Sequence, residues 1–168
     1  MKSPATTDLC DAHEGQLPTG ELQVLTPGYL ALGQHVGFHG RAVTLKVFED
    51  NSFVAEAVKT PGEGRVLVVD GGGSLRCALF GGNLAQAAAR SGWAGVVIHG
   101  CARDADEIDA CAIAVRALAL HPARSVKRGV GERDLVLSFG GARIAPGDWI
   151  YGDRDGVLVS RSVLHASE

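Results

Sequence analysis

The sequence has few aromatic residues, one methionine and no excess of positive charge. Aromatic side chains make up 5% of the 168 residues, and 16 lysines and arginines stand against 19 acidic residues, a formal net charge of −3. A nucleic-acid-binding domain normally carries a basic stripe, so this balance argues against such a function. One basic cluster, Arg124, Lys127 and Arg128, is followed at once by Glu132 and Asp134. We interpret it as a solvated loop.

Long hydrophobic runs and paired cysteines are also missing. No apolar run approaches the roughly 20 residues of a membrane-spanning helix, and residues 1–11 lack the apolar core of a secretory signal. No C-x-x-C spacing occurs among Cys10, Cys77, Cys101 and Cys111. This pattern indicates reduced, mostly buried thiols rather than a disulfide framework or a zinc site. We therefore expect a cytoplasmic protein with neither a membrane nor a nucleic acid as partner.

The middle of the chain predicts a β-α-β unit. Residues 65–70 and 93–98 are short apolar runs, typical of strands buried on both faces. Between them a helix is expected over residues 83–91, with Leu84, Ala87 and Ala88 as its buried stripe. Such units are almost always right-handed, with parallel strands. Around this unit we expect a helix at 8–13 capped by Thr7, a loop with one short strand at 15–33, a strand at 36–48, a helix at 53–59 capped by 49–51, and a helix at 104–110.

The last third of the chain has a different pattern, with short strands separated by glycine and aspartate turns. This pattern suggests a compact, barrel-like β layer. No linker or internal repeat interrupts residues 1–168, so we expect a single domain of the α/β class. The strands expected in this part are 113–120, 135–139, 142–144, 149–151 and 156–159.

Gly81, Gly82, Asn83 and Leu84 form the turn that opens the helix of the β-α-β unit. Backbone N–H groups at the start of a helix lack intrahelical partners and carry the positive end of the helix dipole, so they bind carboxylates and phosphates. Glycines there let a ligand approach the backbone closely. A Gly-Gly turn also precedes helices for purely structural reasons, so this pattern alone leaves both interpretations open.

Arg103 and Asp104 follow the second buried strand directly. Ligands of α/β sheets bind beyond the carboxyl ends of strands, which places this pair and the 81–84 turn at one edge. Arg103 is suited to hold a carboxylate through two parallel hydrogen bonds. Asp104 is suited to hold Mg²⁺ or Mn²⁺, a hard cation that takes few protein carboxylates and keeps several waters. The alternative is that Asp104 only caps the next helix.

Residues 81–85, 92–100 and 102–104 resemble the RraA-like family. That family includes the metal-dependent 4-hydroxy-4-methyl-2-oxoglutarate aldolases and the regulator of ribonuclease activity A. Its aldolase branch is characterised by a glycine, twenty residues, Arg-Asp, two residues and then Glu or Asp, whereas the regulator branch keeps the arginine without the aspartate. The residues of this chain that match the aldolase spacing are Gly82, Arg103, Asp104 and Glu107.

The resemblance implies a swivelling β/β/α fold that assembles into a ring-shaped homotrimer with sites between subunits, and it leaves open whether trimers pair into hexamers. It also implies that residues 81–84 and Arg103 contact a small 2-oxo acid substrate while Asp104 helps to hold the divalent metal. Relatives have been labelled demethylmenaquinone methyltransferases, but no glycine-rich S-adenosylmethionine motif follows a first strand here.

The expected function is a class II, divalent-metal-dependent pyruvate aldolase with oxaloacetate decarboxylase activity, in which Arg103 and Asp104 are catalytic. Both reactions break a C3–C4 bond and leave a pyruvate enolate, whose charge Arg103, the helix N–H groups and the metal would stabilise. The alternative is a non-enzymatic regulator that binds and inhibits an RNA-processing endoribonuclease. The sequence does not identify the physiological substrate or the general base.

Overall fold

A computed structural model describes residues 3–166 of the chain. Its helical elements are α1 (Thr6–Ala12), the 3-10 turn η1 (Glu14–Gln16), α2 (Ser52–Ala57), α3 (Gly82–Arg90) and α4 (Ala105–Asp109). Its strands are β1 (Leu22–Val24), β2 (Leu30–Leu32), β3 (Phe38–Lys46), β4 (Val66–Asp70), β5 (Ala78–Phe80), β6 (Gly95–Ala102), β7 (Ala114–Leu120), β8 (Glu132–Arg133), β9 (Leu137–Phe139), β10 (Ala142–Ile144), β11 (Trp149–Gly152) and β12 (Val157–Ser160).

A parallel sheet forms the centre of this mixed α/β fold. Strands β3, β4, β6 and β7 pair in parallel and in that order, and β5 adds to the end of β6. Every residue of β4 is buried, as expected for a strand covered on both faces. Because β4 and β6 are parallel neighbours and α3 lies between them in the sequence, the predicted β-α-β unit is confirmed.

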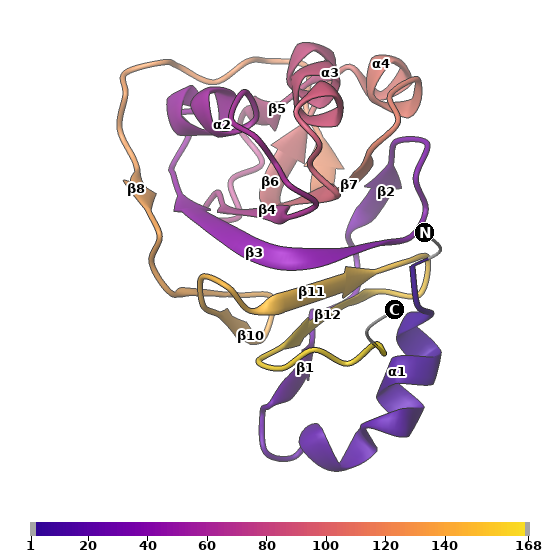
Figure 1. Cartoon of the computed structure of the whole chain (residues 1–168). Coiled ribbons are helices and arrows are strands. Elements are labelled where there is room, and N and C mark those ends of the chain that lie inside the picture. Colours follow the sequence, from indigo (N-terminus) through magenta and orange to yellow (C-terminus); the bar gives the residue numbers. More distant parts are fainter. Residues whose placement is uncertain (1–2, 167–168) are drawn as a thin grey trace.

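The two faces of the central sheet are covered differently. Helices α2, α3 and α4 lie over one face, and β9 to β12 lie on the other side (Figure 1). Alternate residues of the strands therefore belong to two separate cores. Leu67 and Val69 of β4 pack in the core on the helical side, whereas Val66 and Val68 pack against the antiparallel strands. This layering agrees with the expected β/β/α arrangement.

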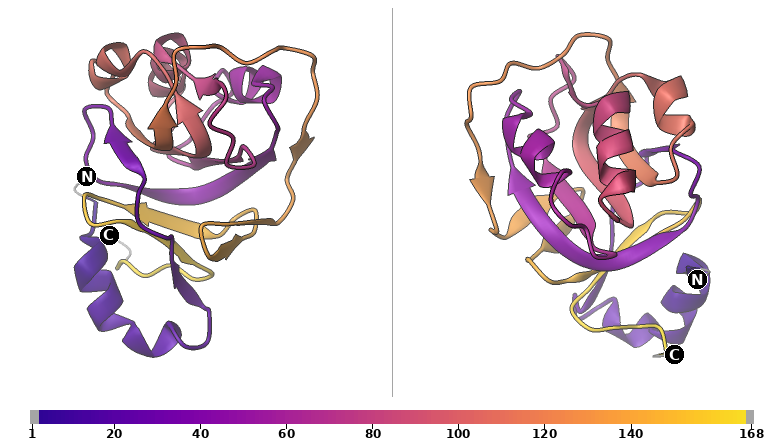
Figure 2. Two further views of the ribbon diagram at one scale, coloured as in Figure 1. Left: turned by 180° about the vertical axis from the view of Figure 1, so that it is seen from behind. Right: turned by 45° about the horizontal axis from the view of Figure 1, so that its top comes forward.

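The antiparallel strands extend the same sheet instead of forming a separate unit. Strand β3 pairs with β4 on one side and with β11 on the other, and β12 and β1 continue from there. The order runs from β1 at one end to β2 at the other, with β9 and β10 as a separate hairpin. Both end strands are labelled in Figure 1, and the left view of Figure 2 shows them from behind. Since this order is open among the described residues, the barrel-like character expected for the last third is not confirmed.

Some local predictions were wrong. Ala5, not Thr7, stands at the N-cap position of α1, and the hydroxyl of the first helical residue, Thr6, donates to Asp153 instead of capping. Residues 15–33 contain two short strands rather than one. In α3, Gly82, Ala85 and Ala88 are fully buried, so the expected stripe is confirmed at Ala88, while Leu84 and Ala87 are half-buried against the same core. Strands β5 and β8 were not predicted.

Among residues 3–166, none of the helices combines the length and the apolar character required to span a membrane.

Candidate functional site

The predicted site residues meet at the edge of the sheet where β5 and β6 end. These two strands are parallel neighbours, so the residues that follow them, Gly81 after β5 and Arg103 after β6, emerge side by side. The N–H of Arg103 donates to the carbonyl oxygen of Phe80 at 2.9 Å, which fixes the two chain segments against each other. The start of α3 and the Arg103–Asp104 corner therefore face one another, as the sequence predicted.

Close packing explains why glycines occupy positions 81 and 82. A Cβ atom on Gly81 would lie 2.7 Å from Asp104 Oδ2 and 3.3 Å from Arg103 Cγ, and one on Gly82 would overlap the carboxylate of Glu107. Any side chain there would displace one of these charged groups. The glycines thus make room for three residues of the aldolase spacing, in addition to exposing the backbone of the turn.

Asp104 is oriented by the backbone at the start of α3. Its Oδ2 accepts a hydrogen bond from the N–H of Gly82 at 3.2 Å. Its own backbone is left-handed, with φ 58° and ψ 48°, a conformation that aspartate and asparagine tolerate better than most residues. Asp104 stands at the N-cap position of α4, but its side chain makes no capping hydrogen bond. The purely structural alternative of a helix cap is therefore not supported.

The guanidinium of Arg103 lies beside this carboxylate. Its Nε is 3.8 Å from Asp104 Oδ2, and one terminal nitrogen donates to the carbonyl oxygen of Pro122 at 3.4 Å. The Arg103 and Asp104 side chains are 38% and 39% exposed. Both charges are thus oriented by neighbouring groups and still open to solvent, so an incoming ligand can reach them.

These groups line a cavity of about 140 Å³. This is small for a ligand pocket and suits a small organic acid better than a nucleotide. Asn83 and Leu84, in the first turn of α3, carry backbone N–H groups that have no intrahelical acceptor. The residues lining the cavity are Asn51, Ala78, Phe80, Gly81, Asn83, Leu84, Arg103, Asp104, Arg124 and Lys127.

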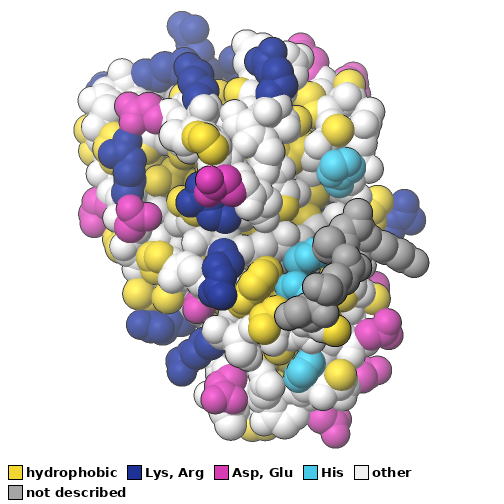
Figure 3. Space-filling view, in the orientation of Figure 1, with side chains coloured by type: hydrophobic (Ala, Val, Ile, Leu, Met, Phe, Trp, Pro, Cys, Tyr) yellow, Lys and Arg dark blue, Asp and Glu magenta, His cyan; other side chains and the backbone are white. Residues whose placement is uncertain are grey.

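Arg124 and Lys127 also line this cavity, although the sequence analysis assigned them only to a solvated loop. Both side chains are exposed, as predicted for a solvated loop, but they line the same cavity as the first turn of α3. Lysine and arginine side chains gather along the upper edge of the molecule, over the helices and the loop that follows β7 (Figure 3). Arg124 and Lys127 follow the carboxyl end of β7. Because the carboxyl ends of parallel strands share one edge of a sheet, this position was the signal that could have placed them at the site.

The oxygen atoms around the cavity suit a hard divalent cation. Asp104 Oδ1 accepts no hydrogen bond from the described residues, and the buried Oδ1 of Asn51 also has no donor among them. Carboxylate and amide oxygens are ligands of Mg²⁺, which keeps several waters when few protein ligands are present. No group of three or more His, Cys, Asp and Glu within residues 3–166 could enclose a metal by itself. A cation held by Asp104 and otherwise by water and substrate fits this donor set.

A larger hollow of about 540 Å³ opens on the other side of the sheet, next to Asp70 and His99. The contacts of His99 are those of a structural histidine. Burial raises the pKa of Tyr29 to about 12 and lowers the pKa of His99, and the Tyr29 hydroxyl shares a hydrogen bond of 2.8 Å with His99 Nδ1. The imidazole also stacks on Phe139, with ring centroids 4.7 Å apart. These contacts hold His99 in place.

Comparison with known proteins gives one consistent family. The model of the RraA-like family, described as Aldolase/RraA, matches residues 6–159. A protein of Cupriavidus necator that carries the provisional name 4-hydroxy-4-methyl-2-oxoglutarate aldolase is 59% identical over 157 residues, which are 94% of this chain and 95% of that protein.

Solved structures agree on the fold and differ in their names. The structure of the RNA-processing inhibitor RraA from Thermus thermophilis has a TM-score of 0.91 and 41% identity, and the match covers 99% of this chain and 98% of that one. A Geobacillus kaustophilus protein described as an S-adenosylmethionine:2-dimethylmenaquinone methyltransferase has a TM-score of 0.91 and 47% identity, with 98% and 99% covered.

Proposed function

The chain belongs to the RraA-like family, and we propose that it is a divalent-metal-dependent pyruvate aldolase acting on 4-hydroxy-4-methyl-2-oxoglutarate and similar 2-oxo acids. The observation that carries this proposal is the Arg103–Asp104 corner, which faces the start of α3 across a cavity of about 140 Å³. The provisional aldolase names of relatives near 59% identity support a carbon–carbon lyase.

In this proposal, the 2-oxo acid end of the substrate binds between Arg103 and the first turn of α3. The N–H groups of Asn83 and Leu84 are free of intrahelical partners and aligned with the positive end of the helix dipole. The Arg103 guanidinium supplies further donors and a permanent charge. Together they would bind the C1 carboxylate and the oxygen on C2.

Asp104 is the proposed metal ligand. A divalent cation at this carboxylate would supply Lewis-acid polarisation of the 2-oxo group. The N–H of Gly82 fixes Asp104 Oδ2 and leaves Oδ1 available for the cation. The orphaned Oδ1 of Asn51 would accept a hydrogen bond from a water or a hydroxyl group in the same cavity.

Arg124 and Lys127 are proposed to bind the second carboxylate of the substrate. They line the same cavity as Arg103, so a ligand anchored at Arg103 would meet them with its other end. Two cations at that position favour a dicarboxylate over a monocarboxylate of similar size.

The bond-breaking step follows from this arrangement. As the C3–C4 bond of the substrate breaks, its electron pair moves into the 2-oxo group and gives an enolate of pyruvate. In the aldol cleavage, the C4 hydroxyl loses its proton and C4 becomes a carbonyl carbon; in oxaloacetate, C4 leaves as CO₂. Arg103 and the helix N–H groups stabilise the enolate oxygen, and protonation at C3 then gives pyruvate. One set of contacts would serve both the aldolase and the decarboxylase reaction.

We further propose that the protein works in the cytoplasm as a homotrimer, or as a hexamer of two trimers. Large apolar side chains remain exposed near the loops that border the cavity, with Leu75, Val126 and Val130 exposed by 58%, 48% and 64%. Association through these residues would complete the site with groups from a neighbouring copy. Light scattering coupled to size-exclusion chromatography would report the mass of the assembly.

A metal-dependence assay tests the proposed activity. Purified protein is given oxaloacetate or 4-hydroxy-4-methyl-2-oxoglutarate, and pyruvate is measured with a coupled dehydrogenase, before and after EDTA treatment and after Mg²⁺ or Mn²⁺ is restored. We expect pyruvate release that EDTA abolishes and the metal restores. Equal rates in EDTA would contradict the metal dependence, and no pyruvate under any condition would contradict the enzyme.

A non-enzymatic regulator of an RNA-processing endoribonuclease is the second candidate. The similarity to the RNA-processing inhibitor from Thermus thermophilis favours it. Titration of the protein into an endoribonuclease assay, beside the pyruvate assay, separates the two. Inhibition at stoichiometric concentrations without pyruvate formation would replace the aldolase proposal with this one.

A further inference from the structure

Asp50 is a buried carboxylate next to the cavity, and it takes no part in the proposed chemistry. Its side chain is 2% exposed. Its Oδ1 accepts hydrogen bonds from the N–H of Ser52 at 2.9 Å and from the Ser52 hydroxyl at 2.6 Å. Its Oδ2 accepts from the N–H of Arg128 at 2.7 Å and of Val130 at 3.4 Å. Asp50 therefore joins the start of α2 to a segment that lies 78 residues further along the chain.

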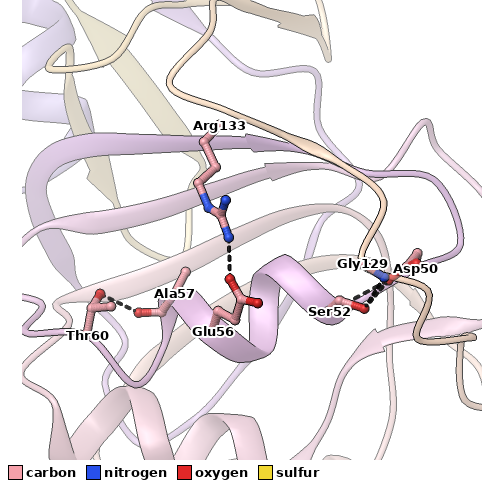
Figure 4. Close-up of polar contacts among 7 residues, drawn as sticks. All are labelled: Asp50, Ser52, Glu56, Ala57, Thr60, Gly129 and Arg133. Atoms are coloured by element: carbon pink, nitrogen blue, oxygen red, sulfur yellow. Dashed lines mark hydrogen bonds and ion pairs between the residues drawn. The ribbon is translucent and has the colours of Figure 1, made fainter.

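The Ser52 hydroxyl strengthens the same connection. It donates to Asp50 and accepts a hydrogen bond from the N–H of Gly129 at 3.0 Å (Figure 4). Burial raises the pKa of Asp50, but the hydrogen bonds from Ser52, Arg128 and Val130 outweigh it and bring the pKa to about 2. The carboxylate is thus charged under ordinary conditions and saturated with donors.

Other contacts fix the neighbouring part of the segment. The N–H of Asn51 donates to the Ser125 hydroxyl at 3.1 Å, and Ala78 at the start of β5 exchanges backbone hydrogen bonds with Ala123 and Ser125. Lys127 lies between these contacts and those of Asp50. The backbone around both cationic residues of the cavity wall is therefore fastened at each end.

Further along, the same segment is tied to the other end of α2. Arg133 forms an ion pair with Glu56 (Figure 4), and its guanidinium lies over the ring of Phe53, 3.8 Å from the centroid. This pair is exposed, so it contributes little to stability. The buried contacts of Asp50 carry the main connection.

We infer that Asp50 is a positioning residue that holds residues 124–130 so that Arg124 and Lys127 form the carboxylate-binding wall of the cavity. This inference rests on the proposed function. A carboxylate is needed because four donors converge on it. In Asp50→Asn, one oxygen would become an NH₂ group facing backbone or hydroxyl donors, so part of the connection would be lost.

The test compares Asp50→Asn with Asp153→Asn, a matched control. Asp153 also accepts hydrogen bonds from a hydroxyl group and from backbone N–H groups, but these belong to Thr6 and Asp155 and not to residues 124–130. Kinetics are measured with 4-hydroxy-4-methyl-2-oxoglutarate, a dicarboxylate, and with 4-hydroxy-2-oxopentanoate, a monocarboxylate. We expect Asp50→Asn to raise KM for the dicarboxylate about 10-fold, the loss of one charged contact, with little change in kcat or in either constant for the monocarboxylate. Asp153→Asn should leave the ratio between substrates unchanged.

Limited trypsin digestion gives a readout that does not depend on catalysis. The segment contains three trypsin sites, Arg124, Lys127 and Arg128, and cleavage there should be faster in Asp50→Asn than in the wild type or the control. Ser52→Ala, a milder change, should show both effects in weaker form if Asp50→Asn does not fold. Unchanged cleavage, or an equal loss for both substrates, would overturn the inference. A wild type that cleaves neither substrate would instead refute the proposed function.

Discussion

Asp104 and Asp153 both follow strands of the same sheet, but their carboxylates accept different numbers of hydrogen bonds. The difference distinguishes an aspartate that is available for binding from one that stabilises the fold. Asp153 comes directly after β11 and accepts hydrogen bonds from the N–H of Thr6 at 2.7 Å, the Thr6 hydroxyl at 2.7 Å and the N–H of Asp155 at 2.9 Å. Asp104 follows β6 and accepts a single N–H hydrogen bond, from Gly82 at 3.2 Å.

The difference lies in unused binding capacity. A carboxylate offers about four acceptor sites. At Asp153, two are used by Thr6 of the N-terminal helix and one by the N–H of Asp155. Asp104 keeps its Oδ1 free of donors among the described residues, and its backbone is left-handed. A left-handed backbone and an oxygen without a hydrogen-bond donor together suggest that Asp104 binds a ligand. Substitution at the two positions should therefore affect different properties.

The largest effect is expected from Asp104→Asn. Asparagine tolerates the left-handed backbone conformation and keeps the shape of the side chain, but it removes the charge that would hold a cation. Pyruvate release should fall by about 1000-fold, with little change in thermal stability. Asp153→Asn should show the reverse, with activity within about twofold of the wild type and a lower melting temperature.

Both variants are compared by the coupled pyruvate assay and by calorimetry. If Asp104→Asn kept more than about a tenth of the wild-type rate at saturating metal, Asp104 would not be the metal ligand. If both variants lost stability and activity in parallel, the distinction between the two aspartates would be wrong.

Arg103→Lys should have the next largest effect. Lysine keeps the positive charge but lacks the planar fork that binds an oxygen pair and the carbonyl oxygen of Pro122 together. We expect kcat to fall about 100-fold, and the oligomeric state to be unchanged. Steady-state kinetics with oxaloacetate measure this, and a loss of only about twofold would show that charge alone is sufficient at this position.

The central part of the fold and the main corner of the site could be predicted because their signals are local. The apolar run of β4 and the glycine turn before α3 lie in continuous stretches, and strand ends of a parallel sheet share one edge. Gly81 and Arg103 therefore came together as expected. The residues that were predicted to act together are separated by about twenty positions and are joined by one β-α-β unit.

The presence of Arg124 and Lys127 at the cavity was missed, because only their position after the carboxyl end of β7 pointed to it. Both residues lie in a mixed-charge loop, which by composition is typical of solvated surface. Their position depends on the buried side chain of Asp50, far away in the sequence, and no periodicity encodes that contact. For the same reason Asp50 was taken only as part of a helix cap, although it connects two distant segments.

The smallest effect is expected on stability at low pH. It tests the contribution of Asp50, whose carboxylate accepts four hydrogen bonds. The pKa of Asp50 lies near 2 in the folded protein, below its ordinary value of 3.8. The charged form therefore stabilises the fold above about pH 4, and this contribution is lost as the pH falls toward 2. The difference in pKa corresponds to about 2 kcal/mol. Hydrogen bonds also lower the pKa values of Asp153 and Glu49. Several groups therefore contribute to the pH dependence of the free energy of unfolding of the wild type.

The contribution of Asp50 is the difference between the wild type and Asp50→Asn. Urea unfolding of both proteins at several pH values between 5 and 2 should show a free energy of unfolding that falls less steeply in the variant, because its amide does not titrate. Parallel slopes for the wild type and Asp50→Asn would mean that the charge of Asp50 does not hold residues 124–130 in place.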